Sequence, residues 1–147
     1  MAEVIALVNL TVKRDSAVGE LSRGMKQRVG IAKTLLHNPP LLLLDEPAAG
    51  LDLGGREELV ARLTDLAADP DAPALVLVTH HVEEIPPGFS HCMLMSEGQV
   101  VAAGLLTDVL TSENLSAAFG QAITVDSIDG RYFARRTRTR AAHRRQL

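Results

Sequence analysis

Apolar runs of strand length alternate with amphipathic stretches of helical period along the first half of the chain. The runs at 41–44 and 74–79 each predict a buried strand, and we expect the first to be buried on both faces, as in a parallel sheet covered by helices. Helical spacing is seen at Met25, Val29, Ala32 and Leu36, and again at Leu59, Leu63 and Leu66. The segments 123–128 and 131–134 flank Asp129-Gly130, which predicts a C-terminal β-hairpin. The pattern therefore predicts an α/β protein with a mostly parallel sheet flanked by helices.

Two acidic residues, Asp45 and Glu46, follow the first strand directly. Open α/β sheets bind ligands at the carboxyl ends of their strands, and an acid there can hold Mg²⁺. A second acid beside it can orient a water for attack on a phosphate. The alternative is a strand that simply ends in a turn, because Asp, Glu and the following Pro47 are turn formers.

A helix is predicted upstream of these acids, with Ser22 as its N-cap and its end near His37, before Pro39-Pro40. The exposed N–H groups and the dipole of such a helix start suit a phosphate, and Gly24 would let the ligand approach the backbone. An ordinary capped amphipathic helix is the alternative. Downstream, Asp52 follows a short turn and His80 follows the second strand, where a lone His is also an ordinary loop residue.

The order of these features resembles the ATP-binding-cassette (ABC) ATPase family over about residues 21–135. In that resemblance, the signature loop is Ser22 to Gly24, the Walker B strand is Leu41 to Glu46, the D-loop is Ala49 to Asp52, and the switch histidine is His80. The resemblance implies a partial ABC-type P-loop NTPase fold that works on ATP and Mg²⁺. It covers most of the chain and is specific in its order.

The same resemblance implies a role for each matching residue. Asp45 would hold Mg²⁺ through water, Glu46 would be the general base or would position the water, and His80 would touch the γ-phosphate. Ser22 and Gly24 would contact ATP bound to a second ABC subunit, and Asp52 would organise that subunit's site. The signature departs from Leu-Ser-Gly-Gly-Gln: Arg23 adds positive charge near phosphate, whereas Met25 removes the amide of the usual Gln.

The phosphate-binding Walker A pattern, G-x-x-x-x-G-K-[ST], is absent from these 147 residues, because none of the three lysines follows a glycine. The glutamine loop of the family is not identifiable either. We therefore do not expect the chain to be active as an ATPase alone.

The N-terminal segment 2–13 is rich in apolar β-formers and loosely resembles the first strand of ABC domains. An internal loss of Walker A and most of the helical subdomain explains this, and truncation with an unrelated leader explains it equally well. We expect residues 1–134 to form an incomplete ABC domain, made of a strand and connector (1–20) and the part from signature to hairpin (21–134). Residues 4–10 would cover the open edge of its sheet.

Charge is uneven along the chain. The tail 135–147 holds six of the fifteen basic residues and no acid, so residues 1–134 carry 9 basic against 18 acidic groups. This tail has no aromatic residues for base stacking, and we expect a solvated, disordered terminus rather than a nucleic-acid site. A single cysteine, Cys92, and the lack of a signal-peptide pattern or membrane span predict a cytoplasmic protein, at most peripheral to the inner face of the membrane.

Three functions agree with these features. The first is the nucleotide-binding motor subunit of an ABC transporter, paired with a Walker A-bearing ABC subunit and, through it, with membrane permease subunits. The second is a catalytically silent remnant or regulatory ABC module. The third, a nucleic-acid-associated ABC protein, rests only on the basic tail.

Overall fold

The computed structural model describes residues 17–37 and 39–137. It divides after Gly88 into two compact units, which are described separately here. The expected N-terminal strand at 2–13, its proposed covering segment 4–10 and the basic tail from Arg138 onward lie outside the described residues.

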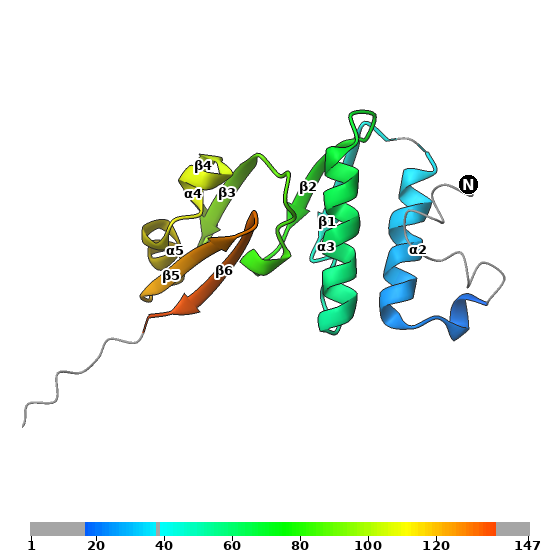
Figure 1. Cartoon of the computed structure of the whole chain (residues 1–147), viewed down its shortest axis with the longest axis horizontal. Coiled ribbons are helices and arrows are strands. Elements are labelled where there is room, and N and C mark those ends of the chain that lie inside the picture. The colour runs from blue at the N-terminus through cyan, green and yellow to red at the C-terminus, as the bar shows by residue number, and fades with distance from the viewer. Residues whose placement is uncertain (1–16, 38, 138–147) are drawn as a thin grey trace, which may run out of the picture. The chain divides into compact units, whose positions relative to one another are not determined.

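The first unit contains a parallel strand pair and the helix that connects its strands (Figure 1). Its elements are η2 (Val18–Glu20), α2 (Arg23–Leu35), β1 (Leu41–Asp45), α3 (Leu53–Ala68), β2 (Ala74–Val78) and η3 (Val82–Glu84). β1 and β2 pair in register from Leu41 opposite Ala74 to Asp45 opposite Val78. Two parallel strands need a crossover connection, and α3 provides it.

Both helices of this unit begin where the sequence supplies a cap. The Ser22 hydroxyl accepts a hydrogen bond from the Met25 N–H at 3.3 Å, and the Asp52 carboxylate accepts one from the Gly55 N–H at 2.8 Å. Each cap satisfies a backbone donor that has no partner inside its helix. The predicted start of α2 is therefore confirmed, and α3, which starts at Leu53, contains the predicted helical positions Leu59, Leu63 and Leu66.

The core of the first unit lies on one face of the strand pair. The buried residues that pack there come from α2, β1, the turn after β1, and α3: Ile31, Leu42, Leu44, Ala48, Leu59, Leu63 and Leu66. On the opposite face, Leu41 and Leu43 are 52% and 62% exposed, and Val76 and Val78 of β2 are also exposed. The expectation of a strand buried on both faces is wrong for the described residues, because α2 and α3 pack on the face that carries Leu42 and Leu44.

The second unit is built around two antiparallel hairpins (Figure 1). Its elements are β3 (His91–Ser96), β4 (Gln99–Leu105), α4 (Leu106–Val109), α5 (Ser112–Phe119), β5 (Ile123–Ile128) and β6 (Arg131–Arg136). Helix α5 contacts β3, β4 and β5, and its Leu115 is fully buried. The Ser96 hydroxyl donates a hydrogen bond to the Ala118 carbonyl at 2.7 Å, which ties β3 to α5.

Turn chemistry explains the hairpins. Glu97-Gly98 and Asp129-Gly130 all have positive φ, the conformation that a two-residue type I′ turn requires. The predicted α/β class and C-terminal hairpin are confirmed. Parallel pairing is confined, among the described strands, to β1 and β2, because turns this short cannot hold a crossover. Strand β6 continues through Arg136, and Arg135 forms an ion pair with Asp126 at 3.2 Å.

Within residues 17–37 and 39–137, no helix has both the length and the apolar character needed to cross a membrane.

Candidate functional site

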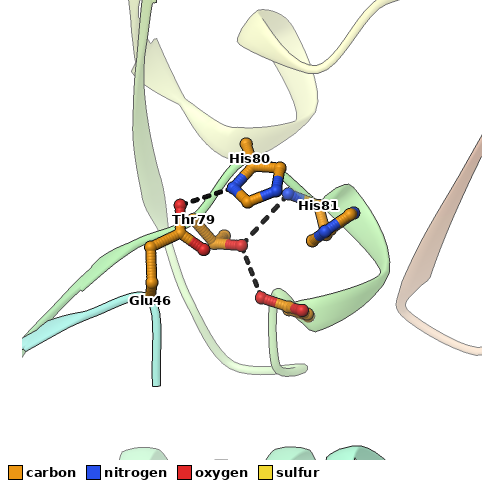
Figure 2. Close-up of polar contacts among 5 residues, drawn as sticks. Glu46, Thr79, His80 and His81 are labelled. Atoms are coloured by element: carbon orange, nitrogen blue, oxygen red, sulfur yellow. Dashed lines mark hydrogen bonds and ion pairs between the residues drawn. The ribbon is translucent and has the colours of Figure 1, made fainter. Parts of the chain in front are cut away.

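Glu46 and His80 meet at the carboxyl ends of the two parallel strands. Glu46 follows β1, His80 comes two residues after the end of β2, and the pairing of Asp45 with Val78 puts both at one edge of the sheet. His80 Nδ1 lies 2.6 Å from Glu46 Oε1, which is hydrogen-bond distance (Figure 2). The structure therefore brings together the two residues to which the resemblance assigns catalytic roles.

The backbone holds Glu46 in an unusual conformation. Its φ is 45°, in the left-handed region that a residue with a side chain rarely adopts. Its N–H donates to the Val78 carbonyl at 2.9 Å, and its carbonyl accepts from the Ala49 N–H at 3.0 Å. Such a conformation costs on the order of 1–3 kcal/mol and persists where the surrounding contacts over-determine it, often at functional sites. The end of β2 thus fixes the direction in which the Glu46 carboxylate leaves the strand.

Glu46 also sets the charge of the histidine. The hydrogen bond that Glu46 accepts and then its negative charge raise the pKa of His80 above its ordinary value; desolvation lowers it by less, and the charge of Glu84 is the smallest raising effect. A histidine that bonds a carboxylate through Nδ1 can also donate from Nε2 only when it is doubly protonated. A raised pKa favours that doubly protonated form, in which Nε2 is a donor that suits an anionic oxygen.

The segment after β2 contains contacts that the sequence analysis did not identify. The buried Glu84 of η3 accepts a hydrogen bond from the Thr79 hydroxyl at 2.5 Å. The same hydroxyl accepts a hydrogen bond from the His81 N–H at 3.0 Å. The signal available in the sequence was an acid five residues after a strand-terminal Thr, which is too weak a pattern to predict a contact.

A second group of candidate residues lies where α2 begins near the turn before α3. A Cβ placed on Gly24 would lie 3.0 Å from Leu51 Cδ2, so the glycine permits close approach of the start of α2 to the turn before α3. Ser22 and Asp52 both act as helix caps; for Ser22 this agrees with the alternative of an ordinary capped helix. Their contacts to a partner's nucleotide remain predictions. The Arg23 side chain lies outside the described part of the chain.

Asp45, the predicted Mg²⁺ residue, is the exposed last residue of β1. Within the described residues, no group of three or more His, Cys, Asp or Glu side chains is arranged to hold a metal ion. Mg²⁺ in nucleotide sites is usually bound by one or two carboxylates together with phosphates and water. The exposed Asp45 is compatible with that mode, and its role stays a prediction.

The chain is similar to known ABC proteins in both sequence and structure. The sequence profile of the ABC transporter family matches residues 1–49. The uncharacterized ABC transporter ATP-binding protein YlmA of Bacillus subtilis (strain 168) is 45% identical over 105 residues, which are 71% of this chain and 40% of YlmA. The molybdenum import ATP-binding protein ModC 1 of Azotobacter vinelandii is 36% identical over 127 residues, which are 85% of this chain and 35% of ModC 1.

A solved ABC transporter of metal-chelate type, in an inward-facing conformation, matches the structure with a TM-score of 0.74 and 26% identity. That match covers 90% of this chain and 53% of the solved one. The chain thus spans less than half the length of YlmA and of ModC 1. The chain belongs to the ABC (ATP-binding cassette) ATPase family.

Proposed function

We propose that the chain acts in a nucleotide-binding motor subunit of an ABC transporter, together with a second ABC subunit that bears Walker A. The observation that carries this proposal is the 2.6 Å contact between Glu46 and His80 at the carboxyl ends of β1 and β2. This is the edge of a parallel sheet where open α/β folds bind ligands. Residues 1–134 would belong to one ABC domain, although the 147 residues contain no Walker A sequence.

Each residue of the pair has a chemical task in this proposal. A carboxylate has about four acceptor sites, so Glu46 can accept a hydrogen bond from a water while Oε1 is engaged by His80. A base must lie within hydrogen-bond reach of the water that it orients or deprotonates. Protonated His80 would donate from Nε2 to an oxygen of the γ-phosphate, where charge stabilisation contributes most to phosphoryl transfer.

ATP and Mg²⁺ fit this edge only in part. Asp45, the exposed last residue of β1, would hold Mg²⁺, which when bound would neutralise charge on the phosphates. The cradle for those phosphates needs backbone N–H groups and a lysine, and this sequence offers no such loop. We therefore propose two sites. Ser22, Arg23 and Gly24 would contact a nucleotide held by the partner subunit, whose site Asp52 would organise, whereas Asp45, Glu46 and His80 would act only on a nucleotide whose phosphates a loop from outside these 147 residues holds at this edge.

The missing Walker A sequence also supports a second candidate, a catalytically silent or regulatory ABC module. Such a module would bind an ABC partner without changing its turnover. In either case the chain would be cytoplasmic and would reach the inner face of the membrane through permease subunits. Two comparisons name a cargo, molybdenum for ModC 1 and a metal-chelate type for the solved transporter. Metal-containing solutes are therefore the first cargo class to test.

The test is ATP turnover by Walker A-bearing ABC subunits from the same genome, each measured with and without this chain. We expect one of them to gain turnover, and we expect Ser22→Arg to abolish that gain because a bulky cation would block the contact at the helix start. Ser22→Thr keeps the capping hydroxyl and is the matched control, with the gain retained. Binding without any change in turnover would favour the silent module, and no binding to any subunit would contradict both.

A further inference from the structure

One carboxylate in the first unit is buried without an evident role in holding the core. Glu84 is 5% exposed, whereas the other charged side chains in the described part of the chain are half-buried or exposed. Burying a carboxylate is unfavourable unless hydrogen bonds compensate for its lost hydration. Glu84 belongs to η3 and follows His80 by four residues, so it lies close in the sequence to the candidate site.

The Thr79 hydroxyl connects this carboxylate to the backbone next to His80. It donates to Glu84 Oε2 at 2.5 Å and accepts from the His81 N–H at 3.0 Å. Figure 2 shows the two hydrogen bonds meeting at the Thr79 oxygen. His80 lies in the chain between Thr79 and His81, which one of these bonds joins. A further backbone hydrogen bond, from the Glu84 N–H to the His81 carbonyl at 3.1 Å, closes the turn.

His80 itself has little packing to orient it. Its side chain is 64% exposed, and its contacts are the bond to Glu46 and a ring contact with His81, whose centroid lies 4.0 Å away. The backbone decides where the imidazole of an exposed histidine can reach, and the hydrogen bond to Glu46 can form only if the His80 backbone keeps the ring within reach. Here the residues on both sides of His80 are fixed, and both are fixed through the same hydroxyl.

We propose that Glu84 is a positioning residue for His80 and that it acts through Thr79. The buried carboxylate holds the Thr79 hydroxyl, the hydroxyl holds the His81 N–H, and the turn so fixed presents the His80 ring to Glu46. This positioning role rests on the proposed function in one respect: His80 is taken to act on phosphate. The geometry of the turn does not depend on that assignment.

Two features of the molecule support this assignment. The hydroxyl is used as donor and acceptor at once, which leaves it one orientation and makes the turn rigid. The charge of Glu84 also acts in the direction that raises the pKa of His80, as the smallest of the effects on it. The hydrogen bonds through Thr79 are therefore the main link between Glu84 and His80.

The test is the imidazole ¹⁵N spectrum of the full chain without nucleotide. In the unaltered chain we expect the His80 signals to report a proton on Nδ1, held by Glu46, and a titration midpoint above that of an ordinary histidine. Thr79→Val and Glu84→Ala should each remove the Nδ1 signature and move the midpoint back toward the ordinary value. Thr79→Ser and Glu84→Gln keep the hydroxyl or an acceptor oxygen, and both should retain the signature.

Thr64→Val is the matched control for loss of a half-buried hydroxyl, because Thr64 donates to the Val60 carbonyl at 2.8 Å inside α3. This variant should leave the His80 signals unchanged. If Thr79→Val and Glu84→Ala lower the melting temperature but leave the His80 signals as they are, Glu84 is merely structural and the proposal is overturned. The spectrum needs no partner, so failure of partner stimulation with the expected spectra would refute the proposed function and leave the positioning role standing.

Discussion

The two faces of β1 differ more than its sequence suggests. Leu42 and Leu44 are buried under α2 and α3, whereas Leu41 and Leu43, of the same residue type on the same strand, are more than half exposed. The exposed face continues onto β2, because Leu43 pairs with Val76, which is also exposed. An apolar strand therefore indicates where a core can form, but the helices that pack on the strand decide which of its two faces is buried.

The largest test of this difference replaces one leucine on each face. Leu42→Ala should lower the free energy of unfolding by about 2–5 kcal/mol, since it leaves a cavity among packed side chains. Leu43→Ala, its neighbour on the exposed face, should cost no more than about 0.5 kcal/mol, as surface substitutions do. Urea unfolding of the two variants measures both values, and equal losses would mean that both faces are covered.

A smaller effect is expected from weakening the cover of the buried face. Asp52→Ala removes the cap of α3 and should cost about 1 kcal/mol, whereas Asp52→Asn keeps an acceptor oxygen and should stay within a few tenths of the unaltered chain. Thermal unfolding followed by circular dichroism separates the two. A loss of equal size in both variants would show that the Asp52 charge, rather than the cap, stabilises α3.

Substituting two glycines of α2 tests how closely this helix packs on the rest of the first unit. Gly30→Ala should stabilise the chain by about 0.5–1 kcal/mol, because alanine favours helix and a Cβ there meets no other atom within 4 Å. Gly24→Ala should gain less or lose stability, because its Cβ would lie 3.0 Å from Leu51 Cδ2. Unfolding midpoints in urea check this, and an equal gain at both sites would contradict the close approach of α2 to Leu51.

The smallest expected effect is a dependence of stability on pH that arises from the Glu46–His80 pair at the ends of the strands. The pKa of His80 is raised in the folded chain, so the stability that its protonation contributes is fully present below the ordinary value near 6.5. That contribution is lost as pH rises through the raised folded value. Because the His80 side chain is largely exposed, solvent screens the pair and the effect should be small. Glu46→Gln should remove it, and unfolding curves across this pH range would show an unchanged dependence if another group were responsible.

Local signals predicted most of the elements. The cap at Ser22, the prolines after α2 and the Asp129-Gly130 turn each act on neighbouring backbone, and the helices and hairpin formed where these residues predicted them. The family resemblance selected Glu46 and His80 as site residues but did not predict the contact between them. The parallel register of β1 and β2 brings the two together across the sheet.

The features that we could not predict from the sequence depend on contacts between residues that are not neighbours in the chain. The exposure of Leu43 depends on which face α3 covers, and the left-handed backbone of Glu46 depends on its bond to Val78. The bond between Thr79 and Glu84 needs the 3₁₀ turn after β2 to bring the two side chains together. None of these three features can be predicted from the hydrophobic periodicity or from capping residues.

The measurement that bears most directly on the proposed function is a calorimetric titration of the purified 147-residue chain with Mg-ATP. A Walker A-bearing ABC subunit titrated in parallel is the positive control. We predict no detectable heat of binding for this chain, since it carries the acid–histidine side of the site without the phosphate-binding loop. Binding in the micromolar range would contradict this, because the chain would then hold a complete phosphate site of its own and would need no partner to supply one.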